Sequence, residues 1–354
     1  MKITDIDKNL RTNNTITAEN VRWIRSTDKA FALYGAYGDD PYTRMPQETA
    51  DKTNEGVAYL NRNTAGIRLR FRTDSPFIAI HSEWAEQCRF PHMPVTGVSG
   101  FDLYRKNGDM QEFVGSFQPP FDCPTGYESI IYTFGGEWDY ILYFPLYNHV
   151  DKLYIGIDEN SKLKEAGKYA RRKPVVYYGS SITQGGCASR PGNAYQAMIS
   201  RALDMDFINL GFSASAKGEQ TIAEYIATLP MSVFVLDYDH NAPTPEHLEK
   251  THYPFYKTIR SAQKDLPVIM LSKPDIFLPD PNAAAAFDER MRIVKSTYEK
   301  AVAGGDKNVY FINGGDIFGN DPLRSCTIDN CHPNDLGFYR FYEALCPLIK
   351  KITG

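Results

Sequence analysis

The chain has 354 residues, of which 42% are hydrophobic and 23% are charged, a balance that is typical of a soluble globular protein. Its formal net charge of -4 at pH 7 gives it no general attraction for nucleic acid or for an anionic membrane, and neither is expected as a partner. The length predicts two domains.

The N-terminus and the cysteines are the parts of the sequence that indicate the cellular compartment of the protein. The segment from Met1 to Lys8 carries acidic residues and lacks the apolar core of a signal peptide. This predicts a cytoplasmic protein, although a secreted or periplasmic protein whose signal peptide had been removed would look the same. Cys326 and Cys331 lie close in sequence and could pair, but free thiols are expected in a large cytoplasmic chain.

The residue pattern of 1–165 is typical of an all-β domain. Short runs that alternate apolar and polar residues, or that are rich in aromatic and β-branched residues, are separated by turn signals such as Asn107-Gly108. The predicted strands are 65–72, 77–81, 100–104, 113–117, 129–134, 140–144 and 153–157. Many short strands of this kind favour a β-sandwich of jelly-roll type.

The residue pattern changes after a polar, basic segment at 166–173, which is interpreted as a linker. Residues 174–354 alternate buried strands with helical patterns. Strands are predicted at 175–178, 206–210, 233–237, 267–271 and 308–312, and helices near 193–204, 219–228, 245–264, 284–303 and 335–352. This alternation predicts a parallel sheet inside a three-layer α/β/α domain of flavodoxin-like type.

The turn after the first of these strands reads Gly179-Ser180-Ser181. A strand, a tight turn and a helix place the turn at the carboxyl edge of the sheet, where open α/β sheets bind ligands. A serine there presents its hydroxyl and an unpaired N–H, as an acyl-transfer nucleophile requires. The alternative is a serine that only caps a helix.

Later strand ends supply the partners of a nucleophile. Gly211 follows the second strand and Asn241 follows the third, while Asp329 and His332 stand just before the last helix. His332 could accept the serine proton, and Asp329 could orient the imidazole. The N–H groups of Ser181 and Gly211, with the Asn241 amide, could stabilise an oxyanion.

These stretches resemble the four sequence blocks of the SGNH hydrolases, also called the GDSL esterase/lipase superfamily. The resemblance covers about residues 174–354 and implies that Ser181 is the nucleophile, with the Ser181 N–H, Gly211 and Asn241 as the oxyanion hole. Upstream, residues 100–104 resemble the Gly-x-Asp-Leu-Tyr signature of a β domain that precedes some SGNH hydrolases. Ser180 stands where the family usually has Asp.

Five further residues could line the pocket, each with a plainer structural alternative: Ser180, His240, Glu219, Trp84 and Trp138. Glu219 could simply be an acid at a helix N-terminus, and the two tryptophans could pack in the β domain. No metal is expected, because Asp237, Asp239 and His240 match no known ligand spacing. No cofactor is expected either.

The resulting hypothesis is a serine esterase that removes small acyl groups, with acetyl favoured, from a small-molecule or oligosaccharide ester. An acyltransferase that uses the same triad is the first alternative, and a carbohydrate-binding protein with a degenerate hydrolase domain is the second. Three roles remain open for the β domain: binding glycan, completing the active-site cleft with loops such as 84–98, or forming a homo-oligomer.

Overall fold

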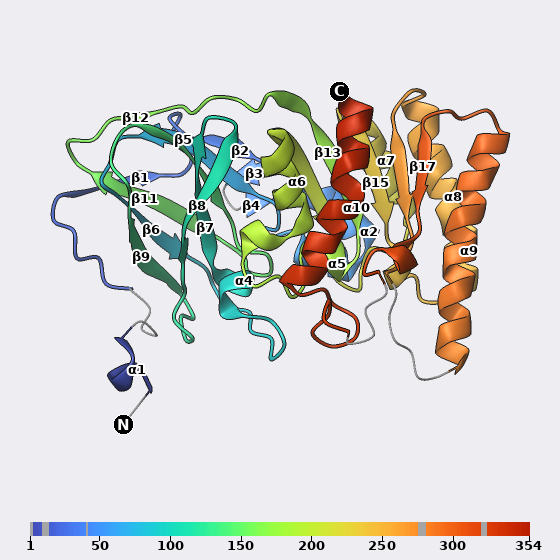
Figure 1. The fold of residues 1–354 in the computed structure, drawn as a ribbon, viewed down its shortest axis with the longest axis horizontal. Helices are drawn as coiled ribbons and strands as arrows, with labels where there is room; N and C mark the ends of the chain where they lie inside the picture. The colour runs from blue at the N-terminus through green and yellow to red at the C-terminus, as the bar shows by residue number, and fades with distance from the viewer. Residues whose placement is uncertain (1–2, 9–13, 40–41, 275–280, 320–323) are drawn as a thin grey trace.

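The computed structural model describes residues 3–8, 14–39, 42–274, 281–319 and 324–354. In its first half, antiparallel strands form two sheets (Figure 1). One sheet has the order β1-β11-β6-β9, and the other has the order β12-β5-β10-β7-β8, with β2 also paired to β5. The bounds are β1 Val21–Arg25, β2 Ala32–Tyr34, β5 Arg68–Thr73, β6 Phe77–Glu83, β7 Phe101–Asn107, β8 Met110–Phe117, β9 Gly126–Tyr132, β10 Trp138–Tyr143, β11 Lys152–Asp158 and β12 Leu163–Lys164.

The two sheets enclose one apolar core. Phe71 and Leu103 from the larger sheet and Ile80 and Ile155 from the smaller one are all fully buried in the same cluster. This packing confirms the predicted β-sandwich, while the jelly-roll connectivity stays a prediction. The remaining elements of this half are short: α1 Ile3–Ile6, β3 Gly38–Asp39, β4 Tyr42–Thr43, α2 Gln47–Thr53, α3 Glu55–Leu60 and α4 Val95–Ser99.

The second half contains a parallel sheet with the order β14-β13-β15-β16-β17. In chain order this is 2-1-3-4-5, the flavodoxin-like arrangement. The strands are β13 Arg171–Gly179, β14 Met205–Gly211, β15 Val233–Asp237, β16 Val268–Leu271 and β17 Val309–Ile312. The helices are α5 Ser181–Gln184, α6 Tyr195–Leu203, α7 Gln220–Thr228, α8 Pro245–Ala262, α9 Pro281–Ala303 and α10 Asp335–Thr353, with short 3₁₀ turns at Pro191–Asn193, Asp239–Asn241 and Gly314–Asp316.

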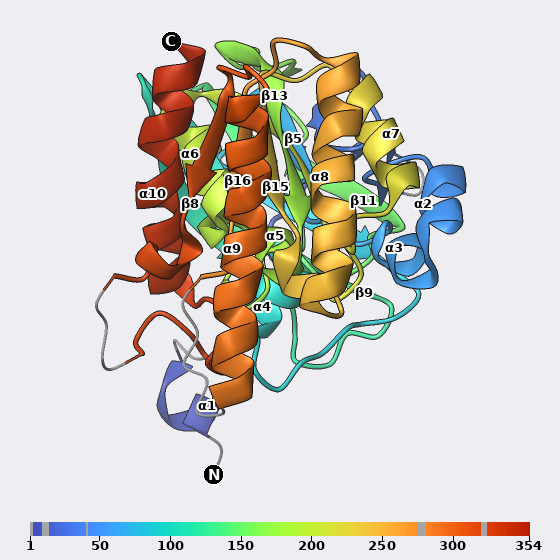
Figure 2. The same ribbon diagram turned by 90° about the vertical axis from the view of Figure 1, so that its right-hand side faces the viewer.

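Helices cover both faces of this sheet. Val175 and Tyr177 of β13 pack with α6 and α10, whereas the alternate residues Val176 and Tyr178 pack with α7, α8 and α9. Figure 2 shows the two groups of helices on either side of the strands. The predicted three-layer α/β/α architecture is therefore confirmed. No helix in the described ranges is both long and apolar enough to cross a membrane.

The two predicted domains share their cores. Tyr104, Ile141 and Tyr143 of the sandwich lie in the same buried cluster as Tyr177 of the parallel sheet. The Asp102 carboxylate, which is fully buried, accepts hydrogen bonds from Arg190 Nη1 and from the Gly192 N–H, both at 2.8 Å. The Gly-x-Asp-Leu-Tyr segment thus holds the sandwich against the loop that follows the Gly179-Ser180-Ser181 turn.

The segment predicted as a linker has no helix or strand until its last three residues, which belong to the parallel sheet. β13 begins at Arg171, and Tyr169 is only 1% exposed because its ring packs against the guanidinium of Arg70, 4.2 Å from the ring centroid. Arg172 and Lys173 are exposed, as expected of a basic linker segment, although they already belong to β13. The six cysteines, including Cys326 and Cys331, form no disulfide among the described residues, as expected.

Candidate active site

The turn after β13 separates the roles of its two serines. Ser180 has an extended backbone and is fully buried, and its Oγ accepts a hydrogen bond from the Ile182 N–H at 3.2 Å. Ser180 is therefore the N-cap of α5. Ser181 is the first residue of that helix, and its own N–H has no acceptor among the described residues. Gly185, in a left-handed conformation with φ 107°, ends the helix after one turn.

A chain of hydrogen bonds links Ser181, His332 and Asp329. Ser181 Oγ lies 2.9 Å from His332 Nε2, and His332 Nδ1 lies 2.8 Å from Asp329 Oδ2. The structure thus brings together the three predicted catalytic side chains, which lie far apart in sequence. They meet at the carboxyl edge of the parallel sheet, where β13 ends.

The surroundings of Asp329 keep its carboxylate charged. Burial alone would raise the pKa of Asp329, but hydrogen bonds from the His332 backbone and ring and from the Cys331 backbone hold that pKa below its usual value. An ionised carboxylate accepts a hydrogen bond from His332 Nδ1–H, which keeps the proton on Nδ1. The Nε2 lone pair then faces the Ser181 hydroxyl, which is the tautomer that a general base requires.

The loop that carries His332 is anchored at both ends. The Ile328 N–H donates to His332 O at 3.0 Å, and the Asn334 N–H donates to Cys326 O at 3.0 Å. Asn334 also caps α10, since its side chain accepts a hydrogen bond from the Gly337 N–H. These bonds fix the histidine without relying on a long helix or strand.

Asn241, predicted as an oxyanion donor, lies in the turn after the third strand of the parallel sheet. It ends the 3₁₀ turn after β15, and its Nδ2 donates to Phe212 O at 2.9 Å. The side-chain amide carries a second proton, which this contact leaves free. Together with the Ser181 N–H, this gives two donors that a developing negative charge could use.

The prediction for Gly211 is corrected by its contacts. The Gly211 N–H donates to Asn209 Oδ1 at 2.8 Å, so it is not free for an oxyanion. The glycine is required by packing instead, because a Cβ there would lie 2.2 Å from the Gln184 backbone nitrogen. A free N–H in the same loop belongs to Ala214, which has a left-handed φ of 54° and donates to no residue in the described part of the chain. Sequence could not indicate it, because a left-handed alanine has no signature.

The β domain reaches the site through two segments that sequence reasoning did not single out by residue. The Tyr147 hydroxyl donates to Ser181 O at 3.3 Å. The Phe90 ring packs against Tyr147 with centroids 5.4 Å apart, and the His92 ring lies 5.7 Å from that of His332. The loop between β6 and α4 therefore lies against His332, which supports the cleft-completing role among the three considered for the β domain.

A cavity of about 500 Å³ adjoins these segments, and its wall comes mostly from the β domain and α3. Tyr147 and Ser213 connect it to the site, since Tyr147 bonds Ser181 and the Ser213 N–H donates to Gln184 Oε1 at 2.9 Å. The rest of the wall combines two aromatic rings with charged and amide groups, including Tyr59, Glu86, Arg89 and Phe90.

The other predicted pocket residues have structural roles, except for His240. Glu219 precedes α7 and accepts from Asn54 Nδ2 at 2.6 Å. Trp84 is 3% exposed inside the sandwich, and Trp138 stacks with Arg105 there. Burial, with the nearby charges of Lys273, His332 and Arg290, holds the pKa of His240 well below its usual value, so it is a neutral ring near His332.

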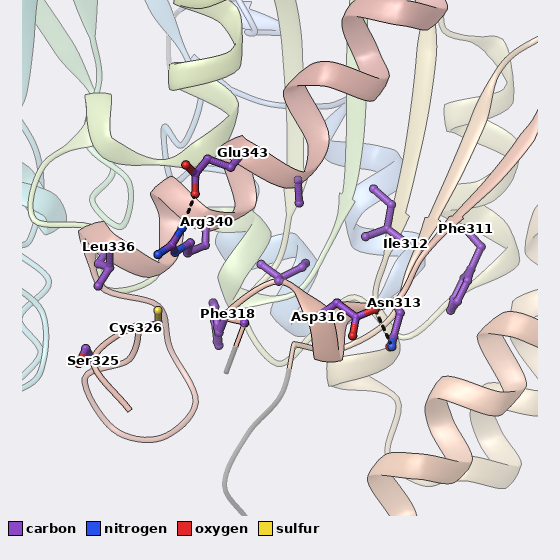
Figure 3. A pocket seen from close by; sticks show the side chains of 13 residues that line it. Phe311, Ile312, Asn313, Asp316, Phe318, Ser325, Cys326, Leu336, Arg340 and Glu343 are labelled. Atoms are coloured by element: carbon purple, nitrogen blue, oxygen red, sulfur yellow. Dashed lines mark hydrogen bonds and ion pairs between the residues drawn. The ribbon is translucent and has the colours of Figure 1, made fainter. Parts of the chain in front are cut away.

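A larger cavity than this one lies elsewhere among the described residues. It has a volume of about 790 Å³ and is formed by the end of β17, the loop after it and the start of α10 (Figure 3). Its polar side chains are paired with one another, Arg340 with Glu343 and Asn313 with Asp316. It contains none of the predicted site residues, so no function is assigned to it.

The flavodoxin-like sheet with this serine at its carboxyl edge is the fold of the SGNH hydrolases. Residues 172–350 match the family model described as the GDSL-like Lipase/Acylhydrolase family, and the chain belongs to this family. Residues 21–163 match a model described as the N-terminus of SGNH-hydrolase-type esterases. No match was found among curated proteins.

Solved structures share the complete two-part fold. A protein described as a GDSL-like lipase from Bacteroides ovatus is 28% identical, with a TM-score of 0.86, and the match covers 94% of this chain and 98% of that one. The salicylyl-acyltransferase SsfX3 from a tetracycline biosynthetic pathway is 21% identical, with a TM-score of 0.78 and coverage of 95% and 100%. A family two carbohydrate esterase from Clostridium thermocellum is 12% identical, with a TM-score of 0.60 and coverage of 94% and 98%. The last two likenesses concern the fold alone.

Proposed function

We propose that this chain is a serine esterase that removes acetyl or another small acyl group from a carbohydrate ester. The observation that carries the proposal is the hydrogen-bonded chain from Ser181 Oγ through the His332 ring to Asp329 Oδ2, with contacts of 2.9 and 2.8 Å. A nucleophile, a base and an orienting carboxylate in one line are the requirements of acyl transfer through a covalent intermediate.

The proposed reaction has two halves. Ser181 Oγ attacks the ester carbonyl while its proton passes to His332 Nε2, and Asp329 stabilises the resulting imidazolium. The oxyanion lies against the Ser181 N–H and the Asn241 amide. When the intermediate collapses, the leaving alcohol takes the proton from His332. Water then attacks the acyl-enzyme with His332 as base, which frees the acid and restores Ser181.

The substrate class is supported by the cavity beside the site. Its volume of about 500 Å³ suits one or two sugar rings better than a long acyl chain. Its wall offers the Tyr59 and Phe90 rings as faces for sugar C–H groups, with Glu86 and Arg89 near them to accept and donate hydrogen bonds. Several solved structures with this fold are carbohydrate esterases, which is consistent with the proposal.

Acyl transfer to an alcohol is the second candidate. It is favoured by the higher structural similarity to the salicylyl-acyltransferase, with a TM-score of 0.78, than to the carbohydrate esterase, with 0.60. Both reactions pass through the same acyl-enzyme and differ only in whether water or another hydroxyl accepts the acyl group. The carbohydrate-binding alternative is disfavoured, because a degenerate site has no reason to keep all three side chains in hydrogen-bond contact.

The test is hydrolysis of p-nitrophenyl acetate, butyrate and octanoate by the wild type, Ser181→Ala and Ser180→Ala. We expect kcat to fall by about 10⁴–10⁶-fold in Ser181→Ala. Ser180→Ala is the matched control, because it loses only the cap of α5 and keeps the nucleophile. Turnover that survives in Ser181→Ala and disappears in Ser180→Ala would contradict the assignment.

The preferred substrate and the acyl acceptor are tested in separate assays. Acetylated xylose and glucose derivatives should be deacetylated, and octanoate should be a poorer ester than acetate. Faster turnover of octanoate than of acetate would refute the small-acyl preference. Ester products that form when glycerol or a free sugar is added, at the expense of free acetate, would favour the transferase.

A further inference from the structure

Two side chains that can bind metal, one histidine and one cysteine, lie beside the proposed catalytic histidine, which can bind metal as well. One ligand atom from each of His92, Cys187 and His332 lies within 4.8 Å of the other two. In the described part of the chain, this is the one group of three or more histidine, cysteine or acidic residues close enough to share an ion. The residues come from three separate loops, so no spacing in the sequence could have indicated them.

The chemistry of this group favours zinc. Two imidazole nitrogens and one thiolate sulfur are ligands that Zn²⁺ prefers, whereas Mg²⁺ and Ca²⁺ prefer oxygen. Zinc bonds of about 2.0–2.3 Å in tetrahedral geometry put ligand atoms roughly 3.3–3.8 Å apart. The group therefore has to contract by about 1 Å. Three protein ligands would leave the fourth position to water.

The backbone around Cys187 adds a second, independent observation. Cys187 has a φ of 75°, in the left-handed region, and its side chain is buried without a disulfide. A residue other than glycine costs about 1–2 kcal/mol in that conformation, and such strain gathers at functional sites. The chain passes directly beside the catalytic ring here, since a Cβ on Gly186 would lie 3.3 Å from His332 Cδ2.

The partner ligand and the supporting carboxylate are also in place. His92 is exposed, and its ring is tilted by 44° to that of His332, so it can turn toward a shared ion. Asp329 Oδ2 already lies 2.8 Å from His332 Nδ1. A carboxylate that holds one nitrogen of a histidine while the other binds metal is a recurrent support of zinc sites.

We infer that His92, Cys187 and His332 form a zinc site through which Zn²⁺ reversibly inhibits the enzyme. The inference rests on the proposed role of His332 as base. Zinc takes the Nε2 lone pair of His332, which now contacts Ser181 Oγ, and the thiol of Cys187 releases its proton to solvent as the sulfur–zinc bond forms. Since Nε2 can no longer accept the Ser181 proton, attack on the ester stops.

The first test does not depend on activity. The full chain, freed of metal with a chelator, is titrated with Co²⁺, whose bond to a thiolate gives a charge-transfer absorption in the near ultraviolet. We expect one Co²⁺ per chain, loss of the band in Cys187→Ser, and its retention in Cys331→Ser. Cys331 is the matched control, because it neighbours His332 but is outside the group. A band that persists in Cys187→Ser, or that is lost in Cys331→Ser, would overturn the ligand assignment.

The second test measures inhibition. Zn²⁺ should abolish p-nitrophenyl acetate hydrolysis, EDTA should restore it, and Mg²⁺ should have no effect. His92→Ala should raise the zinc concentration for half-inhibition by at least about 10-fold, with each protein compared with its own rate in the absence of metal. Equal inhibition of the wild type and His92→Ala would refute the site. A chain without esterase activity would refute the proposed function, and the Co²⁺ titration would still decide on the metal.

Discussion

Replacing Asn241 by alanine tests the oxyanion hole, because this side chain is the donor whose geometry the structure defines best. Its Nδ2 is held by Phe212 O at 2.9 Å and has one proton left for the substrate. Loss of one such donor costs about 2.7–4 kcal/mol in the transition state, so kcat should fall by roughly 10²–10³-fold. KM should change little, because the ground-state carbonyl uses this contact less than the oxyanion does.

The fold should tolerate this change. Phe212 O keeps hydrogen bonds from the Ser215 N–H at 3.0 Å and the Ala216 N–H at 3.2 Å, so no buried carbonyl is left unpaired. We expect a stability loss of about 1 kcal/mol, or roughly 2–3 °C in Tm for a protein of this size. Thermal unfolding therefore separates a catalytic defect from a folding defect.

The assay is steady-state hydrolysis of p-nitrophenyl acetate by the wild type, Asn241→Ala and Asn241→Asp. Aspartate keeps the shape of the side chain but cannot donate when ionised, and its charge repels the oxyanion, so it should be less active than alanine. A kcat for Asn241→Ala within 10-fold of the wild type, or an Asn241→Asp variant more active than Asn241→Ala, would refute the assignment of Asn241 as a donor.

Three further changes give separate readouts. Asp329→Asn should lower kcat by about 10⁴-fold with an unchanged Tm, because the amide favours the wrong tautomer of His332; a loss below 10-fold in steady-state kinetics would contradict this. Gly211→Ala should lower the soluble yield and Tm, because the Cβ meets the Gln184 backbone at 2.2 Å. Burial raises the pKa of Asp239 from its ordinary value to about 6, so between about pH 4 and about pH 6 the native state keeps a proton that the unfolded chain has lost. The free energy of unfolding should therefore fall by about 3 kcal/mol as the pH rises across this range. Urea unfolding of Asp239→Asn should show that this pH dependence is lost.

The strands, helices and triad could be predicted because each leaves a local pattern. Val175 to Tyr178 form an apolar run bounded by a glycine, and such a run is buried on both faces of a parallel sheet. The Asp329-x-x-His332 spacing lets one short loop place both side chains, and the hydrogen bonds of that loop show how it does so.

The parts that could not be predicted depend on contacts across the chain. His92 and Tyr147 reach the site only because the sandwich docks on the parallel sheet. One signal for that docking was present: Tyr140 to Phe144 is continuously apolar rather than alternating, as expected of a strand buried on both faces. The free N–H of Ala214 left no signal, because it depends on a backbone angle that alanine rarely adopts.

The most direct test of the central claim is to identify the residue that an activated-serine reagent modifies. The wild type, Ser181→Ala and Ser180→Ala would be treated with a fluorophosphonate, and peptide mass spectrometry would locate the adduct. A single adduct on Ser181 in the wild type and in Ser180→Ala, with none in Ser181→Ala, is the predicted result. An adduct on another serine, or no adduct on the folded wild type, would contradict the proposal that Ser181, activated by His332, is the nucleophile.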